Sequence, residues 1–326
     1  MRGTRVSWTT ELHKKFGDVV RLQPDELSFT KSQAWTDIYA SRPQLPKSPI
    51  AQIVHPSGNR PLATIVVTED HTRQRKILSH AFSERALKEQ ESILQGYTDL
   101  LIKRMHDHVE AGKEVDICAW YSFITFDIIG DLCFAESFKS LQTGKHHWWV
   151  EQILQGTFVA HSMTVVTLFP PLDSFLAFLL PSRLKRIAAK PFEYTRDLID
   201  KRIARGTNRP DFMKYILENN DNSKQGMNKD ELDSNVQLLI FAGTETSSSA
   251  MTAATWFLLK HPAAMDKVQK EISIAWAEMK LTMAKLLFEF NVELSDNNVK
   301  NWADQKIYLL HDSRPLNVVL KPRKST

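Results

Sequence analysis

The chain has 326 residues, 42% of them hydrophobic and 25% charged, which is the composition of a globular protein. Its formal net charge of +4 is small and scattered along the chain, so nucleic acid is not an expected partner. The two cysteines, Cys118 and Cys133, are too few for a disulfide-rich scaffold and favour a reducing compartment.

The sequence shows no signal peptide and no uncharged apolar run of about 18 residues, so no transmembrane helix is expected. The closest stretch, 163–180, is interrupted by Pro170 and Pro171. We interpret it as a buried or interfacial segment.

Short elements are predicted at the start of the chain. Residues 6–16 are typical of the end of a helix. Asp18–Thr30 has the apolar alternation and the Gln-Pro-Asp-Glu turn of a β-hairpin, and Lys31–Tyr39 is a short helical pattern. The polar, proline-rich stretch 41–61 is predicted to be a surface loop.

A basic stretch over Asp70–Lys88 contains two residues that can act together. His71 and Arg75 stand four residues apart, so they share one face of the predicted helix and can bind an anion jointly. The alternative is an ordinary solvated basic face, which the pair taken alone favours.

A buried helix is predicted at Trp120–Phe138, because this stretch is apolar nearly all round. Cys118 and Cys133 are interpreted as small buried residues of the same core. Further helical patterns cover 145–160, 183–204 and 211–219.

The longest pattern is a helix over 229–261. Asn228 followed by Glu231 matches a capping box at its start, and Pro262 ends it because proline cannot continue the hydrogen-bond ladder. Apolar residues recur at three- and four-residue spacing along one face: Leu232, Val236, Leu239, Ile240, Met251, Ala254 and Leu258.

The middle of this helix reads Ala242-Gly243-Thr244-Glu245-Thr246. Glycine in a helix interior costs about 1 kcal/mol relative to alanine, and threonine hydroxyls can bond back to preceding carbonyls and bend the helix. One interpretation is a flat ligand lying against the backbone, beside a carboxylate and a hydroxyl. The other is a packing glycine next to a satisfied polar cluster. The pentapeptide alone does not decide between them.

This pentapeptide resembles the motif of the long central helix of the cytochrome P-450 monooxygenases, particularly the fungal, microsomal-type members. The resemblance implies a mainly α fold with small β-sheets, in which this helix crosses the face of a haem and distorts at the glycine. It further implies that Ala242 and Gly243 lie against the haem. Glu245 and Thr246 would then handle protons during oxygen activation, by general acid–base delivery.

Other stretches match the same family in its order along the chain. His71 and Arg75 resemble the pair that holds a haem propionate there. Residues 274–281 resemble the helix after the haem-ligand loop, and 302–308 with 316–322 resemble the closing β-hairpin. The resemblance also implies an NADPH-dependent reductase and a small lipophilic substrate as partners, at the endoplasmic reticulum membrane surface.

The resemblance breaks where the iron ligand belongs. The family holds its iron with a cysteine thiolate in a Phe-x-x-Gly-x-Arg-x-Cys-x-Gly loop, and this sequence has no such loop. Counting back from Ala275 by the family's spacing gives position 269, which is Gln269 here. Glu193 and Arg196 have the letters of the family's Glu-x-x-Arg pair but precede the central helix, so we reject them. No residue is assigned as a metal ligand.

We therefore interpret the chain as an incomplete cytochrome P-450 fold with two parts, 1–272 and 273–326, fused where several helices and the ligand loop are missing. A start inside the first helix suggests that the family's anchor is also missing, which would leave this chain in the cytoplasm. Three functions stay open: a haem-dependent monooxygenase, a non-catalytic splice or gene-model remnant, and a helical ligand-binding or interaction protein. The missing cysteine favours an inactive chain.

Overall fold

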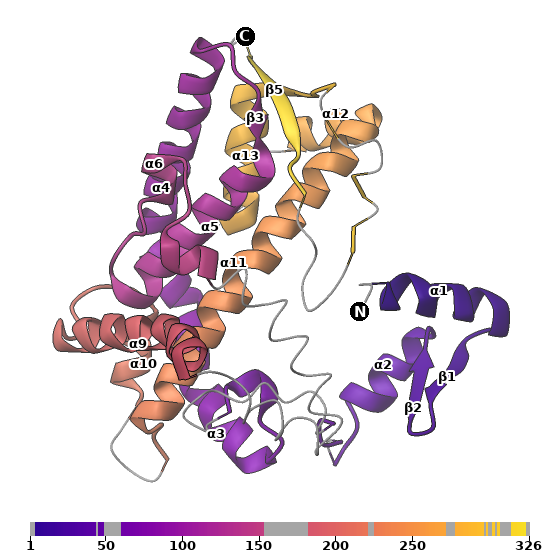
Figure 1. Ribbon diagram of the computed structural model, residues 1–326, viewed down its shortest axis with the longest axis vertical. Helices are drawn as coiled ribbons and strands as arrows, with labels where there is room; N and C mark the ends of the chain where they lie inside the picture. Colours follow the sequence, from indigo (N-terminus) through magenta and orange to yellow (C-terminus); the bar gives the residue numbers. More distant parts are fainter. Residues whose placement is uncertain are drawn as a thin grey trace.

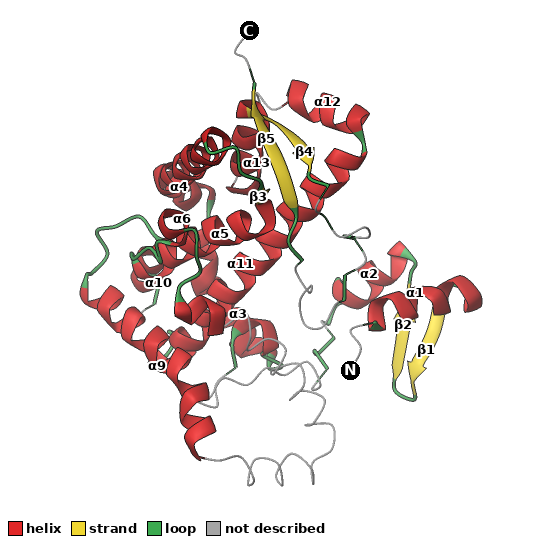
Figure 2. Ribbon diagram, turned by 45° about the horizontal axis from the view of Figure 1, so that its top comes forward, coloured by secondary structure: helices red, strands yellow, loops and turns green. Residues whose placement is uncertain are grey.

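Helices dominate the computed structural model, as Figures 1 and 2 show, and this confirms the mainly α fold with small sheets. The structure describes residues 4–43, 45–48, 60–152, 182–220, 225–271, 278–296, 298, 302–303, 305–306 and 314–323. The helices in these ranges are α1 (Arg5–Phe16), α2 (Ser32–Tyr39), η2 (Leu62–Thr64), α3 (Thr68–Ser79), η3 (His80–Phe82), α4 (Glu84–Glu110), α5 (Ile117–Phe134), α6 (Ser140–Thr143), α9 (Ser182–Ala204), α10 (Phe212–Glu218), α11 (Lys229–Lys260), α12 (Pro262–Glu271) and α13 (Glu278–Glu289). The strands are β1 (Val19–Gln23), β2 (Glu26–Phe29), β3 (Val115–Asp116), β4 (Phe290–Leu294) and β5 (Asn317–Pro322).

The first elements form a small unit beside the helical body in Figure 1. α1 leads into the antiparallel hairpin β1–β2, in which Val20 pairs with Ser28, and α2 follows. Gly17 links α1 to β1 with a φ of 91°, a conformation that favours glycine. The helix, hairpin and helix expected over the first 39 residues are confirmed.

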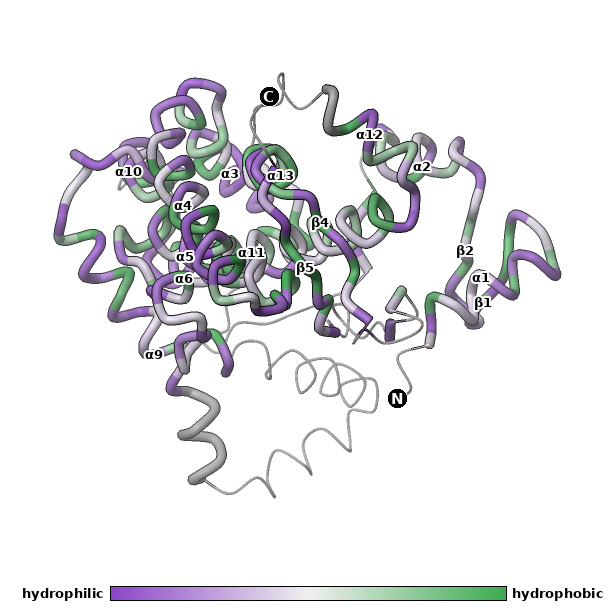
Figure 3. The backbone as a smooth tube through the Cα atoms, turned by 90° about the horizontal axis from the view of Figure 1, so that it is seen from above, coloured by the Kyte–Doolittle hydropathy of each residue, from purple (hydrophilic) through white to green (hydrophobic). Residues whose placement is uncertain are grey.

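α5 is the core of the molecule. It packs along α11 and against α4, and the hydrophobic parts of α5, α11 and β5 gather there in Figure 3. Among the described residues it is the one helix long and apolar enough to cross a membrane, but 78% of it is buried inside the protein. It is therefore a core helix, as expected. The predicted end of this helix at Phe138 is wrong. α5 ends at Phe134, because the next residue, Ala135, adopts a left-handed conformation with a φ of 56°.

One carboxylate joins the start of α5 to the C-terminal sheet. Asp116 Oδ1 accepts hydrogen bonds from the backbone N–H groups of Cys118 at 3.1 Å and Leu316 at 3.0 Å. The sheet has the order β3-β5-β4 with antiparallel neighbours, and Asp116 pairs with Asn317 across β3 and β5. The last described strand is thus tied directly to the first turn of the core helix.

The partner of β5 differs from the expectation. We expected 302–308 to pair with 316–322, but β5 pairs with β4, which follows α13 without an intervening loop. Trp302 instead lies in a turn, and its ring centroid is 5.5 Å from that of Trp256 on α11. Residues 304, 307 and 308 lie outside the described residues, so the predicted strand over 302–308 is tested only at Trp302 and Ala303, which lie in a turn, and at Gln305 and Lys306.

Several expected elements lie wholly or partly outside the described residues. The expected helix at 274–281 is present from Glu278 onward, within α13. The expected junction at 272–273, the segment 163–180 and the second half of 145–160 are not among the described residues.

α9 and α10 are confirmed as helices and are joined by a buried ion pair. Arg202 donates from Nε and Nη2 to the two carboxylate oxygens of Asp211, each at 2.7 Å. Both side chains are almost completely buried. Asp211 also caps α10 by accepting from the backbone N–H of Lys214. The carboxylate oxygens of a buried ion pair must accept hydrogen bonds from the protein, because burial has removed the water that would otherwise solvate both charges.

α11 begins and ends as its sequence indicates. The Asn228 side chain accepts from the N–H of Glu231, and the Glu231 carboxylate accepts from the N–H of Asn228, both at 2.9 Å. This confirms the capping box. The helix ends at Lys260, and Pro262 occupies the first position of α12, where its missing N–H is not needed.

Gly130 and Gly96 give a matched test of core packing. A Cβ at Gly130 would lie 2.5 Å from Cε2 of Phe138, whereas one at Gly96 in α4 would meet nothing within 4 Å. Gly130→Ala is therefore expected to lower the free energy of unfolding by about 1–3 kcal/mol. Gly96→Ala should raise it by about 0.5–1 kcal/mol, through helix propensity. Urea unfolding measures both, and a Gly130→Ala chain as stable as the wild type would contradict the packing.

Candidate functional site

The pentapeptide of α11 presents its side chains to two different sides. Ala242 and Thr246 are exposed, while Thr244 and Glu245 are buried. Gly243 lies against α5, where an added Cβ would come 3.1 Å from Cδ1 of Ile129. The glycine is thus a close-packing position, which is one of the two interpretations that the sequence left open.

α11 is α-helical through Gly243 without interruption. The threonine hydroxyls do bond back as predicted. Thr244 Oγ1 donates to Ile240 O at 2.8 Å, and Thr246 Oγ1 donates to Ala242 O. Each hydroxyl bonds to a carbonyl that also belongs to the backbone hydrogen-bond ladder of the helix, and it does not displace the backbone bond. The helix therefore continues.

A stripe of small and apolar residues follows the open side of α11. Its members stand three or four residues apart and are exposed or half-buried, which places them on one helix face. The stripe consists of Leu239, Ala242, Thr246, Ala250, Ala253 and Phe257. Because Ala242, Thr246 and Ala250 have short side chains, a flat apolar ligand can approach the backbone there.

A hydrogen-bond network centred on Glu231 fixes α3 against the start of α11. Arg73 Nη2 donates to Glu231 Oε1 at 2.7 Å, and Gln74 Nε2 donates to the same oxygen at 3.1 Å. Asn235 Nδ2 donates to Gln74 Oε1 at 2.6 Å, and Asn235 Oδ1 accepts from the N–H of Leu62 at 2.8 Å. The network therefore holds η2 and α3 on the face of α11 that bears Asn235.

Through its bond to Gln74, Asn235 places α3 on the same side of α11 as the stripe. Asn235, Leu239, Ala242 and Thr246 are spaced by four, three and four residues, so they share one face. Ala242 lies seven residues beyond Asn235, about 10 Å along the helix axis. The structure thus brings α3, which carries His71 and Arg75, to the start of the open stripe.

His71 and Arg75 form part of a larger cation cluster. Burial, Lys47 and Arg75 together lower the pKa of His71, and burial and Arg75 lower the pKa of Lys47. Within the described ranges, none of these three side chains has an ion pair with an acid. Sequence reasoning missed Lys47, because it stands in a proline-rich loop with no periodic pattern. Its position before a turn gave no signal.

Neither cysteine suits an iron atom as a thiolate ligand. Cys133 is completely buried in α5, and burial raises the pKa of its thiol far above the usual range. Burial, followed by the negative charge of Asp116, raises the pKa of Cys118 to about 12. Both are therefore neutral thiols near pH 7. The cationic donors suit the carboxylates of a haem, and the stripe suits its flat face, but the chain's thiols do not suit its iron.

Arg196, from the rejected Glu-x-x-Arg match, has a different role in the structure. Arg196 donates from Nε to Asp233 at 2.9 Å and from Nη2 to Asp230 at 2.8 Å, so it ties α9 to α11. Residue 269 lies within α12, and its side chain is outside the described part of the chain.

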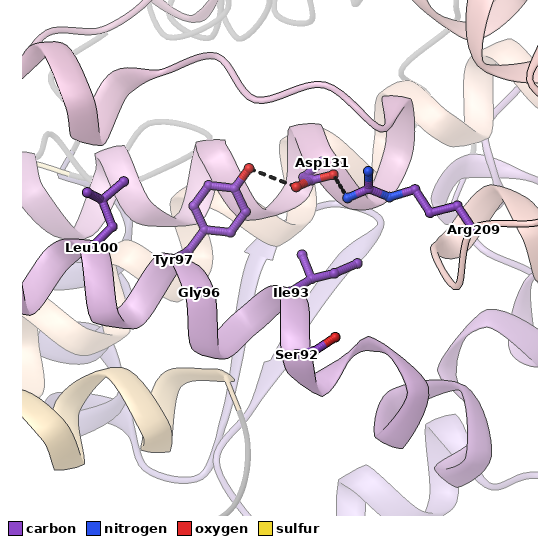
Figure 4. Close-up of a pocket in the computed structure, with 7 residues that line it drawn as sticks. All are labelled: Ser92, Ile93, Gly96, Tyr97, Leu100, Asp131 and Arg209. Carbon is purple, nitrogen blue, oxygen red and sulfur yellow. Dashed lines mark hydrogen bonds and ion pairs between the residues drawn. The ribbon is translucent and has the colours of Figure 1, made fainter.

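A surface hollow of about 310 Å³ lies between α4 and α5, with Arg209 at its edge (Figure 4). The Asp131 carboxylate in it accepts from Tyr97 OH at 2.8 Å and pairs with Arg209. The Asp131 carboxylate is thus satisfied by Tyr97 and Arg209, whereas the buried Nε of Arg209 has no hydrogen-bond partner among the described residues.

Comparisons with known proteins give a family match and several relatives. The cytochrome P450 family model matches residues 2–276. The chain is 38% identical over 272 residues to cytochrome P450 monooxygenase astJ of Aspergillus oryzae, covering 82% of this chain and 54% of that protein. It is 34% identical over 275 residues to cytochrome P450 monooxygenase astA of Talaromyces wortmannii, with 83% and 55% covered.

A third relative is the averantin hydroxylase of Dothistroma septosporum, 33% identical over 273 residues, with 83% of this chain and 51% of that protein covered. The chain thus spans about half the length of the curated relatives it matches. On the family match and these identities, the chain belongs to the cytochrome P450 family.

The state of the two thiols can be tested directly. Because both pKa values are raised, we expect iodoacetamide at pH 7.5 to leave Cys118 and Cys133 unmodified in the folded chain. The same reagent in 8 M urea, roughly the usual denaturing concentration, should modify both. Mass spectrometry measures the difference, and rapid modification of folded Cys118 would show that a thiolate is available after all.

Proposed function

We propose that the chain is part of a haem-dependent monooxygenase that inserts oxygen into a small lipophilic substrate. The observation that carries this proposal is that α3, the helix that contains His71 and Arg75, is bonded through Gln74 to the same side of α11 as the open stripe. Membership of the cytochrome P450 family supports it, and so do the curated relatives, whose names describe monooxygenases and a hydroxylase.

His71 and Arg75 would hold the propionates of the haem, and Ala242 would lie near the ring. Gly243, for which the sequence predicted the same role, packs against Ile129 of α5 instead. When bound, the haem supplies the oxygen chemistry. Glu245 and Thr246 are proposed to move protons, since a carboxylate and a hydroxyl are suitable general acid–base groups. Glu245 Oε1 accepts from Ser249 Oγ at 3.4 Å, and Thr246 Oγ1 must exchange its bond to Ala242 O to face a ligand.

We further propose that this chain alone does not complete the reaction, because O–O cleavage in this family needs a thiolate ligand. Gln269 at the ligand position cannot replace a thiolate, and Cys133 is buried in the core while Cys118 is a half-buried thiol with a raised pKa. This is the remnant interpretation. An NADPH-dependent reductase as electron donor, and the endoplasmic reticulum membrane surface as location, remain part of the proposal for the family's complete proteins.

A purely helical ligand-binding or interaction protein is the second candidate. The exposed stripe on α11 favours it, because an apolar ligand other than haem has access to the same face. The two candidates differ in whether the α3 cations matter, since a neutral ligand does not need them.

The spectrum of the chain supplied with haem tests the proposal. After reduction and addition of carbon monoxide, we expect absorption bands of a haem bound without a thiolate. The thiolate-type Soret band would overturn the inactive interpretation, because Cys118 or Cys133 would then reach the iron. No change at all in the haem spectrum would contradict haem binding.

Removal of the cation pair tests the same site by affinity. The His71→Ala/Arg75→Ala double variant is expected to bind haem at least tenfold more weakly, since a hydrogen bond to a charged group contributes about 1.5–3 kcal/mol. Lys76→Ala, an exposed lysine on the same helix, is the matched control. Quenching of tryptophan fluorescence measures the affinities. Equal affinities in all three chains would contradict the assigned pair.

A further inference from the structure

The surface hollow between α4 and α5 is built from three elements that are far apart in the sequence. α4 supplies most of its lining, α5 supplies Asp131, and the loop between α9 and α10 supplies Arg209 (Figure 4). Its volume of about 310 Å³ is at the lower end of the range of about 300–1,000 Å³ that is typical of small-molecule sites. The hollow is therefore large enough for a small ligand.

The α4 side of the hollow is apolar and partly bare. Ile93, Tyr97 and Leu100 stand three or four residues apart, so they share one helix face, and all three are half-buried. Gly96 lies among them without a side chain, and a Cβ there would meet nothing within 4 Å. The glycine therefore leaves the backbone of α4 open to contact with a flat apolar group.

The opposite side of the hollow is an ion pair with spare donors. The Asp131 carboxylate accepts from Tyr97 OH on one oxygen at 2.8 Å and from Arg209 Nη2 on the other. A guanidinium has five N–H donors. Within the described part of the chain, Arg209 Nε is buried without a hydrogen-bond partner, because its contact with Asp211 Oδ2 spans 3.9 Å. The Arg209 side chain is 40% exposed, so a ligand can reach the guanidinium from solvent.

The charges on this side are already balanced. Asp131 neutralises Arg209, and both carboxylate oxygens of Asp211 accept from Arg202. An anionic ligand would approach the Asp131 carboxylate, and a cationic ligand would approach the guanidinium, so each meets a like charge. A neutral carbonyl oxygen meets neither penalty, because it needs only a donor, and guanidinium N–H groups provide one.

We propose that this hollow binds a small neutral molecule with an apolar body and a carbonyl group. The apolar body lies on the backbone at Gly96, between Ile93 and Leu100, and the carbonyl oxygen accepts from the guanidinium of Arg209. None of the described lining residues belongs to α3 or α11, so this site is separate from the candidate haem site. A bound ligand would join α4 to the loop between α9 and α10.

Three probes with the same phenyl group test the class of ligand. Phenylacetamide is neutral and has a carbonyl acceptor, phenylacetate is an anion, and phenethylamine is a cation near neutral pH. The δ1 methyl signal of Ile93, assigned by its loss in Ile93→Val, reports binding by NMR, because a phenyl ring nearby shifts it. We expect phenylacetamide to shift this signal saturably and to bind at least about threefold more tightly than either charged probe.

Two variants test the open backbone and the donor separately. Gly96→Leu fills the hollow from an exposed helix position and is expected to abolish the saturable shift. Arg209→Lys keeps a positive charge beside Asp131 but lacks the guanidinium donors, so phenylacetamide should bind about fivefold more weakly. Lys103→Leu, which adds a leucine at an exposed position of α4 outside the hollow, is the matched control and should bind as the wild type does. A thermal melt establishes that each variant is folded.

Three results would overturn the proposal. The first is a wild type whose Ile93 signal does not move at about 10 mM phenylacetamide, where a ligand with a dissociation constant of about 1 mM occupies most sites. The second is equal binding by Gly96→Leu and the wild type, which would place the ligand elsewhere. The third is equal binding of all three probes, or an unchanged affinity in Arg209→Lys, because the carbonyl would then have no role.

Discussion

The carboxylate of Glu231 joins the elements that make the candidate site. It closes the capping box of α11 through Asn228 and binds Arg73 and Gln74 of α3. Because the Arg73–Glu231 pair is partly buried, removal of either partner would leave the other charge without its partner, which destabilises the contact between α3 and α11. The orientation of α3, and with it the direction in which His71 and Arg75 face, therefore depends on how one helix begins.

Local signals in the sequence were sufficient for α5, α11 and the first hairpin, but most of α4 (Glu84–Glu110) was not predicted. Asn228 and Glu231 predicted the start of α11, and the apolar composition of α5 predicted its burial. β4 was not predicted, although its burial alternates along the strand, because it continues from α13 without a glycine or proline. Its strand conformation depends on pairing with β5, a contact between residues far apart in the sequence.

The site was predictable residue by residue but not as an arrangement. The spacing of His71 and Arg75 placed them on one face, and the structure added Lys47 from a loop that sequence periodicity does not describe. Gly243 was ambiguous for a physical reason. A glycine permits close approach of any neighbour, and the neighbour here is Ile129 of α5, which only the packing of two helices could reveal.

The hydrogen bonds of Asp116 connect the C-terminal strand β5 to the core helix α5. One of its oxygens holds both the first turn of α5 and the backbone next to β5. The C-terminal strand β5 is thus an integral part of the fold and is not added to a helical body that is complete without it. It shares a cap with the most buried helix, so local opening of β5 also removes a hydrogen bond from the carboxylate that caps α5.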